Sequence, residues 1–248
     1  RTDVQTQTCT NSGKVLIAAG FPGKFTEIID LYNASFVCKG LPNYPRKCFI
    51  PEGGLVGNHP LICGGYFRGA QKTCFSLTKT GWKQSASLSV PRYRMGRGSI
   101  IYKNQLLLHG GFGLRAGLNT SELATPNMVH KSANLPITLF RHCNIQINDS
   151  TILITDGHSN KSFFQNLKTG DWIEGPEMLV PRLGHGCTKF KFEGRSIAIV
   201  AGGTRNIGRS VEWLDLGQLN NGWQEGDFFK ESLSTPIIEF QFSFTAMN

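Results

Sequence analysis

A glycine-rich stretch, residues 61–73, has the residue types of a phosphate-binding loop. It reads LICGGYFRGAQKT, in which Gly64 and Gly69 have the spacing of the G-x-x-x-x-G-K-[ST] motif, but Lys72-Thr73 follow two residues late. Such a loop must open a helix whose N-terminal amide groups face the phosphates. The residues that follow, TCFSL, are instead typical of a short strand. We therefore interpret the glycines as structural, because glycine permits backbone conformations and close packing that a Cβ atom would block.

The cysteines suggest a different chemistry. The sequence has seven, none of them in a C-x-x-C pair, which argues against a zinc ribbon or a thioredoxin-type motif. Two pairs are placed symmetrically about expected hairpin turns, one near Arg68-Gly69 and one near Asn43: Cys63 with Cys74, and Cys38 with Cys48. Opposed residues on antiparallel strands are ~4.5–5.5 Å apart at Cα, within the ~4.4–6.8 Å range of disulfides. We predict both disulfides, with buried free thiols as the alternative, and find no partners for Cys9, Cys143 and Cys187.

The histidines do not form a ligand or catalytic pattern. The six are scattered along the chain rather than spaced as metal ligands: His59, His109, His130, His142, His158 and His185. We therefore predict no catalytic residue, no metal site and no cofactor.

Composition and chain ends indicate a secreted all-β protein with an anionic partner. The 248 residues are 40% apolar and include 29 glycines, a balance that favours strands and turns. The longest apolar runs, such as residues 196–203, are too short to cross a bilayer, so we expect no membrane insertion. The net charge is +9, and the sequence begins at Arg1 without an apolar leader, as expected of a processed or excised chain. Four sequons give weak support for secretion, at Asn33, Asn119, Asn148 and Asn160.

An internal repeat explains the glycine pair. Similar strand-then-glycine segments end at Gly20, Gly65, Gly111, Gly157 and Gly203, so successive steps are 45, 46, 46 and 46 residues. Each repeat then contains a second short strand, a hydrophobic or tryptophan anchor, a Pro-Arg or a variant of it, and a last strand that leads into the next repeat. We place the repeats at residues 14–58, 59–104, 105–150, 151–195 and 196–248, with residues 1–13 as an N-terminal strand.

The order of diglycine, tryptophan and Pro-Arg at this period resembles the kelch repeat over residues 14–248. The resemblance implies one all-β domain over residues 1–248, a kelch-type β-propeller of four-stranded blades, with five or six blades. Stacked sheets of this kind bury the faces that one sheet would leave exposed. Some repeats depart from the pattern, as in Ala19-Gly20 and Asp156-Gly157.

The enzymes of this family do not map onto the sequence. The copper radical oxidases use a Cys-Tyr cross-link with tyrosine and histidine ligands, a set that we cannot place on the five tyrosines. The plant specifier proteins carry an iron motif resembling E-x-x-x-D-x-x-x-H. Glu122 and His130 have its outer spacing, but Pro126 stands in place of the aspartate and cannot bind metal.

The placement of basic residues predicts a binding surface. In a four-stranded blade, the loops after the first and third strands emerge on one face. That face would carry 14 of the 26 basic residues: Lys24, Arg46, Lys47, Arg68, Lys72, Arg92, Arg94, Arg97, Arg115, Arg141, Lys161, Arg182, Arg205 and Arg209. The alternative is that these side chains solubilise loops and that Pro-Arg is a structural element of the repeat.

We therefore predict a secreted propeller without catalytic activity that binds an anionic protein or an acidic polysaccharide of the matrix. Nucleic acid is not the expected partner, because few aromatics are available for base stacking (Phe21, Tyr66, Phe67, Tyr93, Phe112) and a disulfide-bonded chain rarely meets it. The alternatives are an intracellular substrate-recognition adaptor and an oxidase or isomerase on the same fold.

Overall fold

The computed structural model describes residues 14–19, 24–30, 40–204, 210–226 and 246–247. Apart from a single 3-10 turn at Leu219–Asn221, the regular structure of these residues is antiparallel β-sheet. The second strands of the sheets are short and buried on both faces, as in β4, β8 and β12, whose burial patterns each have four buried residues in a row. Strands of this kind must be covered on both sides, which requires sheets to stack on one another.

The described strands form five sheets, which we number in chain order. The first is β19-β1-β2, from Ala246–Met247, Lys14–Ala18 and Thr26–Asp30. The second is β3-β4-β5-β6, from Glu52–Val56, His59–Cys63, Cys74–Thr78 and Gly81–Gln84. The third is β7-β8-β9-β10, from Ile100–Tyr102, Gln105–His109, Ser121–Ala124 and Val129–Ser132. The fourth is β11-β12-β13-β14, from Cys143–Asn148, Thr151–Thr155, Ser162–Asn166 and Trp172–Glu174. The fifth is β15-β16-β17-β18, from Gly186–Phe192, Arg195–Ala201, Val211–Asp215 and Gln224–Glu225.

The sheets are out of phase with the predicted repeats by one strand. The last strand of each repeat is joined to the first strand of the next by a two-residue turn: Gly57-Asn58, Lys103-Asn104, Asp149-Ser150 and Glu193-Gly194. Several of these turn residues have positive φ, as the tightest hairpin turns require. A two-residue turn forces its flanking strands to pair. The last strand of a repeat therefore becomes the first strand of the following sheet.

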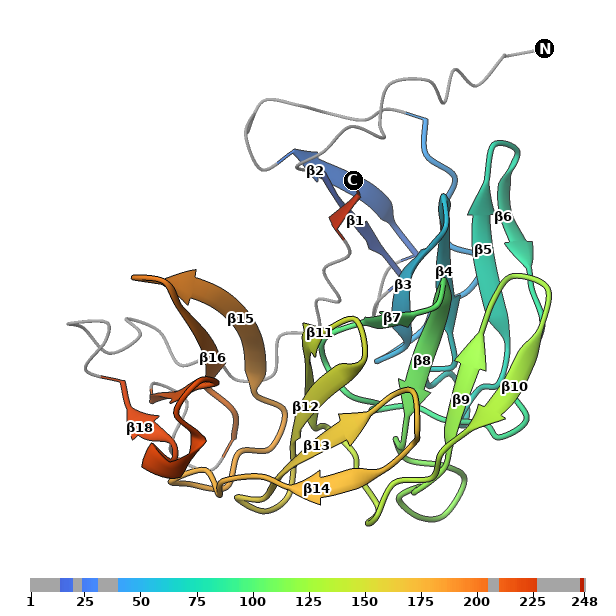
Figure 1. Ribbon diagram of the computed structural model, residues 1–248. Helices are drawn as coiled ribbons and strands as arrows, with labels where there is room; N and C mark the ends of the chain where they lie inside the picture. The colour runs from blue at the N-terminus through green and yellow to red at the C-terminus, as the bar shows by residue number, and fades with distance from the viewer. Residues whose placement is uncertain (1–13, 20–23, 31–39, 205–209, 227–245, 248) are drawn as a thin grey trace.

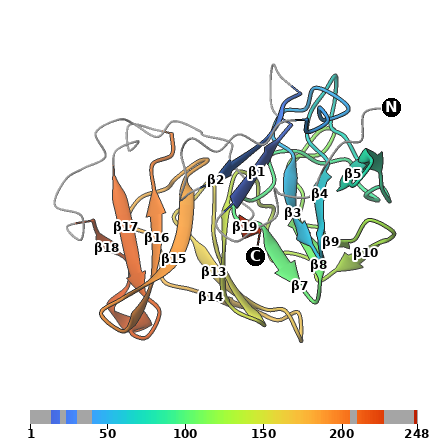
Figure 2. The ribbon, with the colours of Figure 1, turned by 90° about the horizontal axis from the view of Figure 1, so that it is seen from above.

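The sheets follow one another around a common centre in chain order (Figure 1). The first strand of each four-stranded sheet lies nearest the centre and the last lies at the periphery, and β11 contacts both β7 and β15. Figure 2 shows the same succession of sheets from above. The core lies between neighbouring sheets. Leu61 packs with Leu106, for example, and Leu153 packs with Ala198 and Leu214.

The end of the chain joins the first sheet. Ala246 and Met247 in β19 pair with Val15 and Lys14 in β1. The predicted N-terminal strand, residues 1–13, lies outside the described residues. No helix among the described residues is long and apolar enough to cross a membrane. The predicted all-β architecture with four-stranded antiparallel sheets is confirmed.

Candidate anion-binding face

The glycine pairs position the loops of one face. The amide of Gly65 donates to Arg92 O, and in the next sheet the amide of Gly111 donates to Leu139 O. Both glycines have φ near +90°, and a Cβ on Gly65 would lie 2.2 Å from Cys48 Sγ. Glycine is therefore required where each hairpin loop meets the loop that crosses to the next sheet. Residues 64–73 form such a hairpin loop between β4 and β5, so no helix follows them and the phosphate-loop motif has no structural counterpart.

Two predicted binding residues, Arg92 and Arg182, are instead buried structural residues. Arg92 is fully buried; its guanidinium donates to Gly110 O and Thr120 O and forms an ion pair with Glu122 at 2.6 Å. Burial lowers the pKa of Arg92, and Glu122 opposes that shift. These arginines cannot contact a partner, because their charge is neutralised within the loops that they join.

Arg182 repeats this arrangement two sheets later. It donates to Gly202 O and Ser210 O and pairs with Glu212 at 2.8 Å. Glu122 and Glu212 occupy equivalent positions, since each pairs across its hairpin with the residue two places before the glycine pair. The alternative interpretation of Pro-Arg, as a structural element of the repeat, is therefore correct for these two residues.

The other sheets replace this ion pair. In the second sheet, Phe75 occupies the position of the glutamate, and Arg46 Cζ lies 4.9 Å from the centre of its ring. In the fourth sheet, Phe163 occupies that position. In the loop that leads into the fourth sheet, the residue whose carbonyl oxygen accepts from Gly111 is the buried Leu139, not Arg141. The predicted match of Arg141 to the Pro-Arg arginine was thus displaced by two residues.

The remaining predicted cations lie on the loops of this face with differing exposure. Lys24, Lys47, Arg68, Lys72 and Arg115 are exposed, whereas Arg46, Arg94, Arg97 and Arg141 are partly buried. Lys161 pairs with Glu174 at 2.7 Å, and this pairing raises the pKa of Lys161. Arg205 and Arg209 lie outside the described residues. We call the five exposed cations together with Arg94 and Arg141 the basic face.

A row of aromatic rings crosses the same loops. Tyr66 lies 5.0 Å from Tyr93, Tyr93 5.8 Å from Phe112, Phe112 5.7 Å from Phe140, and Phe140 5.9 Å from His158, measured between ring centres. The sequence had drawn attention to Tyr66, Tyr93 and Phe112 only as separate residues. The signal for a row was present, since the residue after each second glycine reads Phe, Tyr, Phe, His and Thr in the five repeats.

Two disulfides are present among the described residues. Cys63–Cys74 joins directly opposed residues of β4 and β5, with Cα atoms 4.0 Å apart, as predicted. The predicted Cys38–Cys48 disulfide is wrong: Cys48 is a buried free thiol whose Sγ donates to Gly64 O, and Cys38 lies outside the described residues. Burial raises the pKa of the Cys48 thiol to about 11.

The second disulfide was not predicted. Cys143–Cys187 joins β11 to β15, the first strands of the fourth and fifth sheets, which lie nearest the centre of the molecule. One signal could have indicated it, because both cysteines stand at or near the start of the last strand of their repeats. The pairing itself depends on how two sheets stack.

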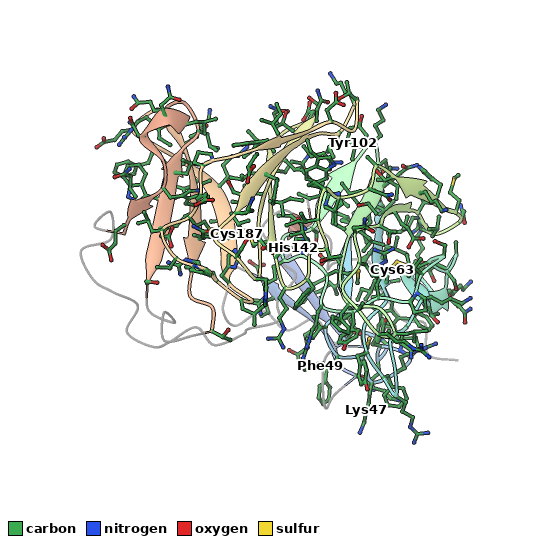
Figure 3. All side chains as sticks on the ribbon, turned by 90° about the horizontal axis from the view of Figure 1, so that it is seen from below. Lys47, Phe49, Cys63, Tyr102, His142 and Cys187 are labelled. Atoms are coloured by element: carbon green, nitrogen blue, oxygen red, sulfur yellow. A yellow bond between two sulfur atoms is a disulfide. The ribbon has the colours of Figure 1, made fainter. Side chains whose placement is uncertain are left out.

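Three buried histidines lie near the centre rather than on the basic face. His109 ends β8, while His142 and His185 directly precede β11 and β15. Figure 3 shows His142 near the middle of the molecule, close to Cys187, with Lys47 at the periphery. Burial lowers the pKa of His109 and His185 to about 3 and that of His142 well below its ordinary value. No group of His, Cys, Asp or Glu in the described part of the chain could hold a metal ion.

The predicted glycosylation residues differ in environment. Asn119 and Asn148 are exposed, whereas Asn160 is partly buried and its side-chain amide donates to Glu177. Asn33 lies outside the described residues.

Antiparallel sheets arranged around a centre, with diglycine loops and a repeated buried arginine that pairs with a glutamate of the next sheet, define a kelch-type β-propeller. No protein-family model matches the sequence, and no curated protein matches it. Among solved structures, the chain is similar to YjhT, a kelch-repeat β-propeller, with a TM-score of 0.72. The match covers 87% of this chain and 81% of YjhT at 10% sequence identity. The chain therefore has the kelch-repeat β-propeller fold, and at this identity the likeness concerns the fold alone.

Proposed function

We propose that this protein is an extracellular, non-catalytic binding propeller that engages an anionic partner through the basic face. The observation that carries the proposal is the set of five exposed cations on the loops of one face. In the described part of the chain these five form no ion pair, so their charge is available to a partner. Exposed like charges on neighbouring loops raise the local concentration of an anionic ligand and speed its association.

The two disulfides support the extracellular part of the proposal, because they indicate an oxidising environment. Disulfides persist in secreted proteins and are rare in the cytosol, where thiols are kept reduced. Cys63, Cys74 and Cys143 are buried and Cys187 is partly buried in the two disulfides.

The side chains of the basic face support binding rather than catalysis. They are cations that lie on the same loops as the row of aromatic rings, and both kinds of group attract and hold a ligand. The histidines with strongly lowered pKa values lie elsewhere and are fully buried.

Binding to immobilised heparin, measured with increasing salt, tests the anionic partner. We expect the triple variant Arg68→Gln, Lys72→Gln, Arg115→Gln to elute at clearly lower salt than the unmodified protein, because exposed charges are screened over about 10 Å at 0.1 M salt. The matched control Lys79→Gln, Lys168→Gln, Lys191→Gln removes the same charge from exposed positions outside the basic face. An equal shift for both variants would show that net charge alone determines retention, and would contradict the proposal.

Thiol labelling of the purified, unreduced and denatured protein tests the compartment. We expect Cys48 to be alkylated, whereas Cys63, Cys74, Cys143 and Cys187 remain unlabelled until a reductant is added. Labelling of all five without reductant would favour an intracellular substrate-recognition adaptor instead.

A further inference from the structure

The aromatic row is a continuous feature of three consecutive sheets. Tyr66, Phe112 and His158 come from the hairpin loops of the second, third and fourth sheets, and Tyr93 and Phe140 come from the crossing loops between them. Backbone hydrogen bonds hold the row in place, since Tyr93 and Phe112 donate their amides to each other's carbonyl oxygens. The row therefore follows the face from sheet to sheet as a positioned set of rings.

The rings are accessible to a ligand. Tyr66 is 43% exposed, His158 is exposed, and Tyr93, Phe112 and Phe140 are partly exposed. Leu114, at the tip of the loop that carries Phe112, is 75% exposed and extends the apolar surface.

Cations accompany the row at every step. Each of the first four rings is followed within three residues by an arginine: Arg68, Arg94, Arg115 and Arg141. Arg94 Cζ lies 5.5 Å from the ring of Tyr93, and Arg68 Cζ lies 5.6 Å from the ring of Phe67. Along the row the sequence thus repeats one unit, an aromatic residue followed within three residues by an arginine.

We propose that the aromatic row binds one strand of an acidic polysaccharide, with successive sugar rings on the aromatic side chains and their acidic groups on the arginines. This inference rests on the proposed function and names the class of its partner. A repeating site suits a repeating ligand. A sugar ring that carries a carboxylate or sulfate has an apolar C–H face and a charged edge, so it satisfies both halves of the unit.

The disulfides distinguish this ligand from a nucleic-acid strand, because a disulfide-bonded protein of an oxidising compartment rarely meets nucleic acid. A folded protein partner would have no corresponding repeat, and would be expected to bury a broad patch rather than a row one residue wide.

Titration with heparin oligosaccharides of increasing length tests the inference. We expect affinity to rise with length until the row is covered. The variant Tyr66→Leu, Phe112→Leu keeps apolar side chains but removes two rings, and we expect it to weaken binding about tenfold with an unchanged salt dependence. The control Phe192→Leu alters an aromatic side chain of comparable exposure at the β15–β16 turn and is expected to bind normally. Thermal unfolding of each variant verifies that it is folded.

The two proposals fail separately. If the arginine and lysine substitutions above weaken binding but the leucine substitutions do not, the basic face stands and the aromatic row is overturned. If neither set weakens binding, both are overturned. Single-stranded oligo(dT) and polyglutamate of matched charge are the comparison ligands. Equal affinity for either one, with equal loss on leucine substitution, would overturn the assignment to a polysaccharide.

Discussion

The guanidinium of Arg92 is the clearest case of a charge whose role depends on its surroundings. Glu122 pairs with it and also accepts from the amide and hydroxyl of Ser89, so one buried carboxylate of β9 holds the loop between β6 and β7 at two positions. In the fourth sheet the two positions are occupied by the buried apolar residues Leu139 and Phe163. The ion pair is thus one of two solutions to the same packing position.

We expect Arg92→Met to destabilise the protein by about 3–5 kcal/mol, because Glu122 would be left buried without its partner charge. The double variant Arg92→Met, Glu122→Leu should recover much of this loss, since it resembles the apolar arrangement of the fourth sheet. Urea unfolding measures both, with the exposed Arg115→Met as a control expected within about 0.5 kcal/mol of the unmodified protein. A double variant no more stable than the single one would contradict this account.

At the scale of elements, neighbouring sheets are linked through the loops that cross between them and through their first strands, which lie nearest the centre of the molecule. The indole N–H groups of Trp82, Trp172 and Trp223 donate to carbonyl groups of the loops that lead into their own sheets, at Pro42, Asn134 and Pro176. Cys143–Cys187 adds a covalent link between the fourth and fifth sheets, whereas Cys63–Cys74 lies within one hairpin. The two disulfides therefore restrain loops of different length, with separations of 44 and 11 residues.

We expect the loss of Cys143–Cys187 to cost more stability than the loss of Cys63–Cys74. The chain-entropy model gives about 4 kcal/mol for the longer loop and about 3 kcal/mol for the shorter one. The paired alanine variants, compared by denaturant unfolding, measure the difference. The reverse order would show that the hairpin, rather than the junction between sheets, depends more on its disulfide.

At the scale of the whole molecule, the buried histidines make stability depend on pH. The pKa values of His109 and His185 are lowered to about 3 in the folded protein, from about 6.5 when the chain is unfolded. Between these values the unfolded chain binds protons that the folded protein does not. The stability contributed by neutral burial is therefore complete above about pH 6.5 and is lost as the pH falls toward 3.

We expect the free energy of unfolding to fall with decreasing pH in this range, by about 1.4 kcal/mol per pH unit for each fully affected histidine. His142→Leu should flatten the dependence, because it removes a buried histidine whose pKa is lowered in the folded protein. The substitution breaks no hydrogen bond of the ring, since neither ring nitrogen of His142 has a partner in the described part of the chain. The control His158→Asn alters an exposed histidine and should leave the slope unchanged. Urea unfolding at several pH values measures all three proteins, and identical slopes would contradict the assignment to His142.

The local features of the fold could be predicted from the sequence because their causes are local. The glycine pairs recur at each hairpin, so their period indicated the repeat, and opposed cysteines about one turn indicated Cys63–Cys74. The membership of each sheet was predicted one strand out of phase. The sequence repeat begins at the strand before each glycine pair, whereas the two-residue turns pair that strand with the last strand of the preceding repeat.

The sequence alone thus determined the repeat, the short strands and the excess of positive charge. Only the tertiary structure decided which cations are available, because the burial of Arg92 and Arg182 depends on glutamates 30 residues away in sequence. It also paired Cys143 with Cys187 and brought Tyr66, Tyr93, Phe112, Phe140 and His158 into one row. Each of these contacts joins loops or strands that are distant in the chain, and only the stacking of the sheets brings them together.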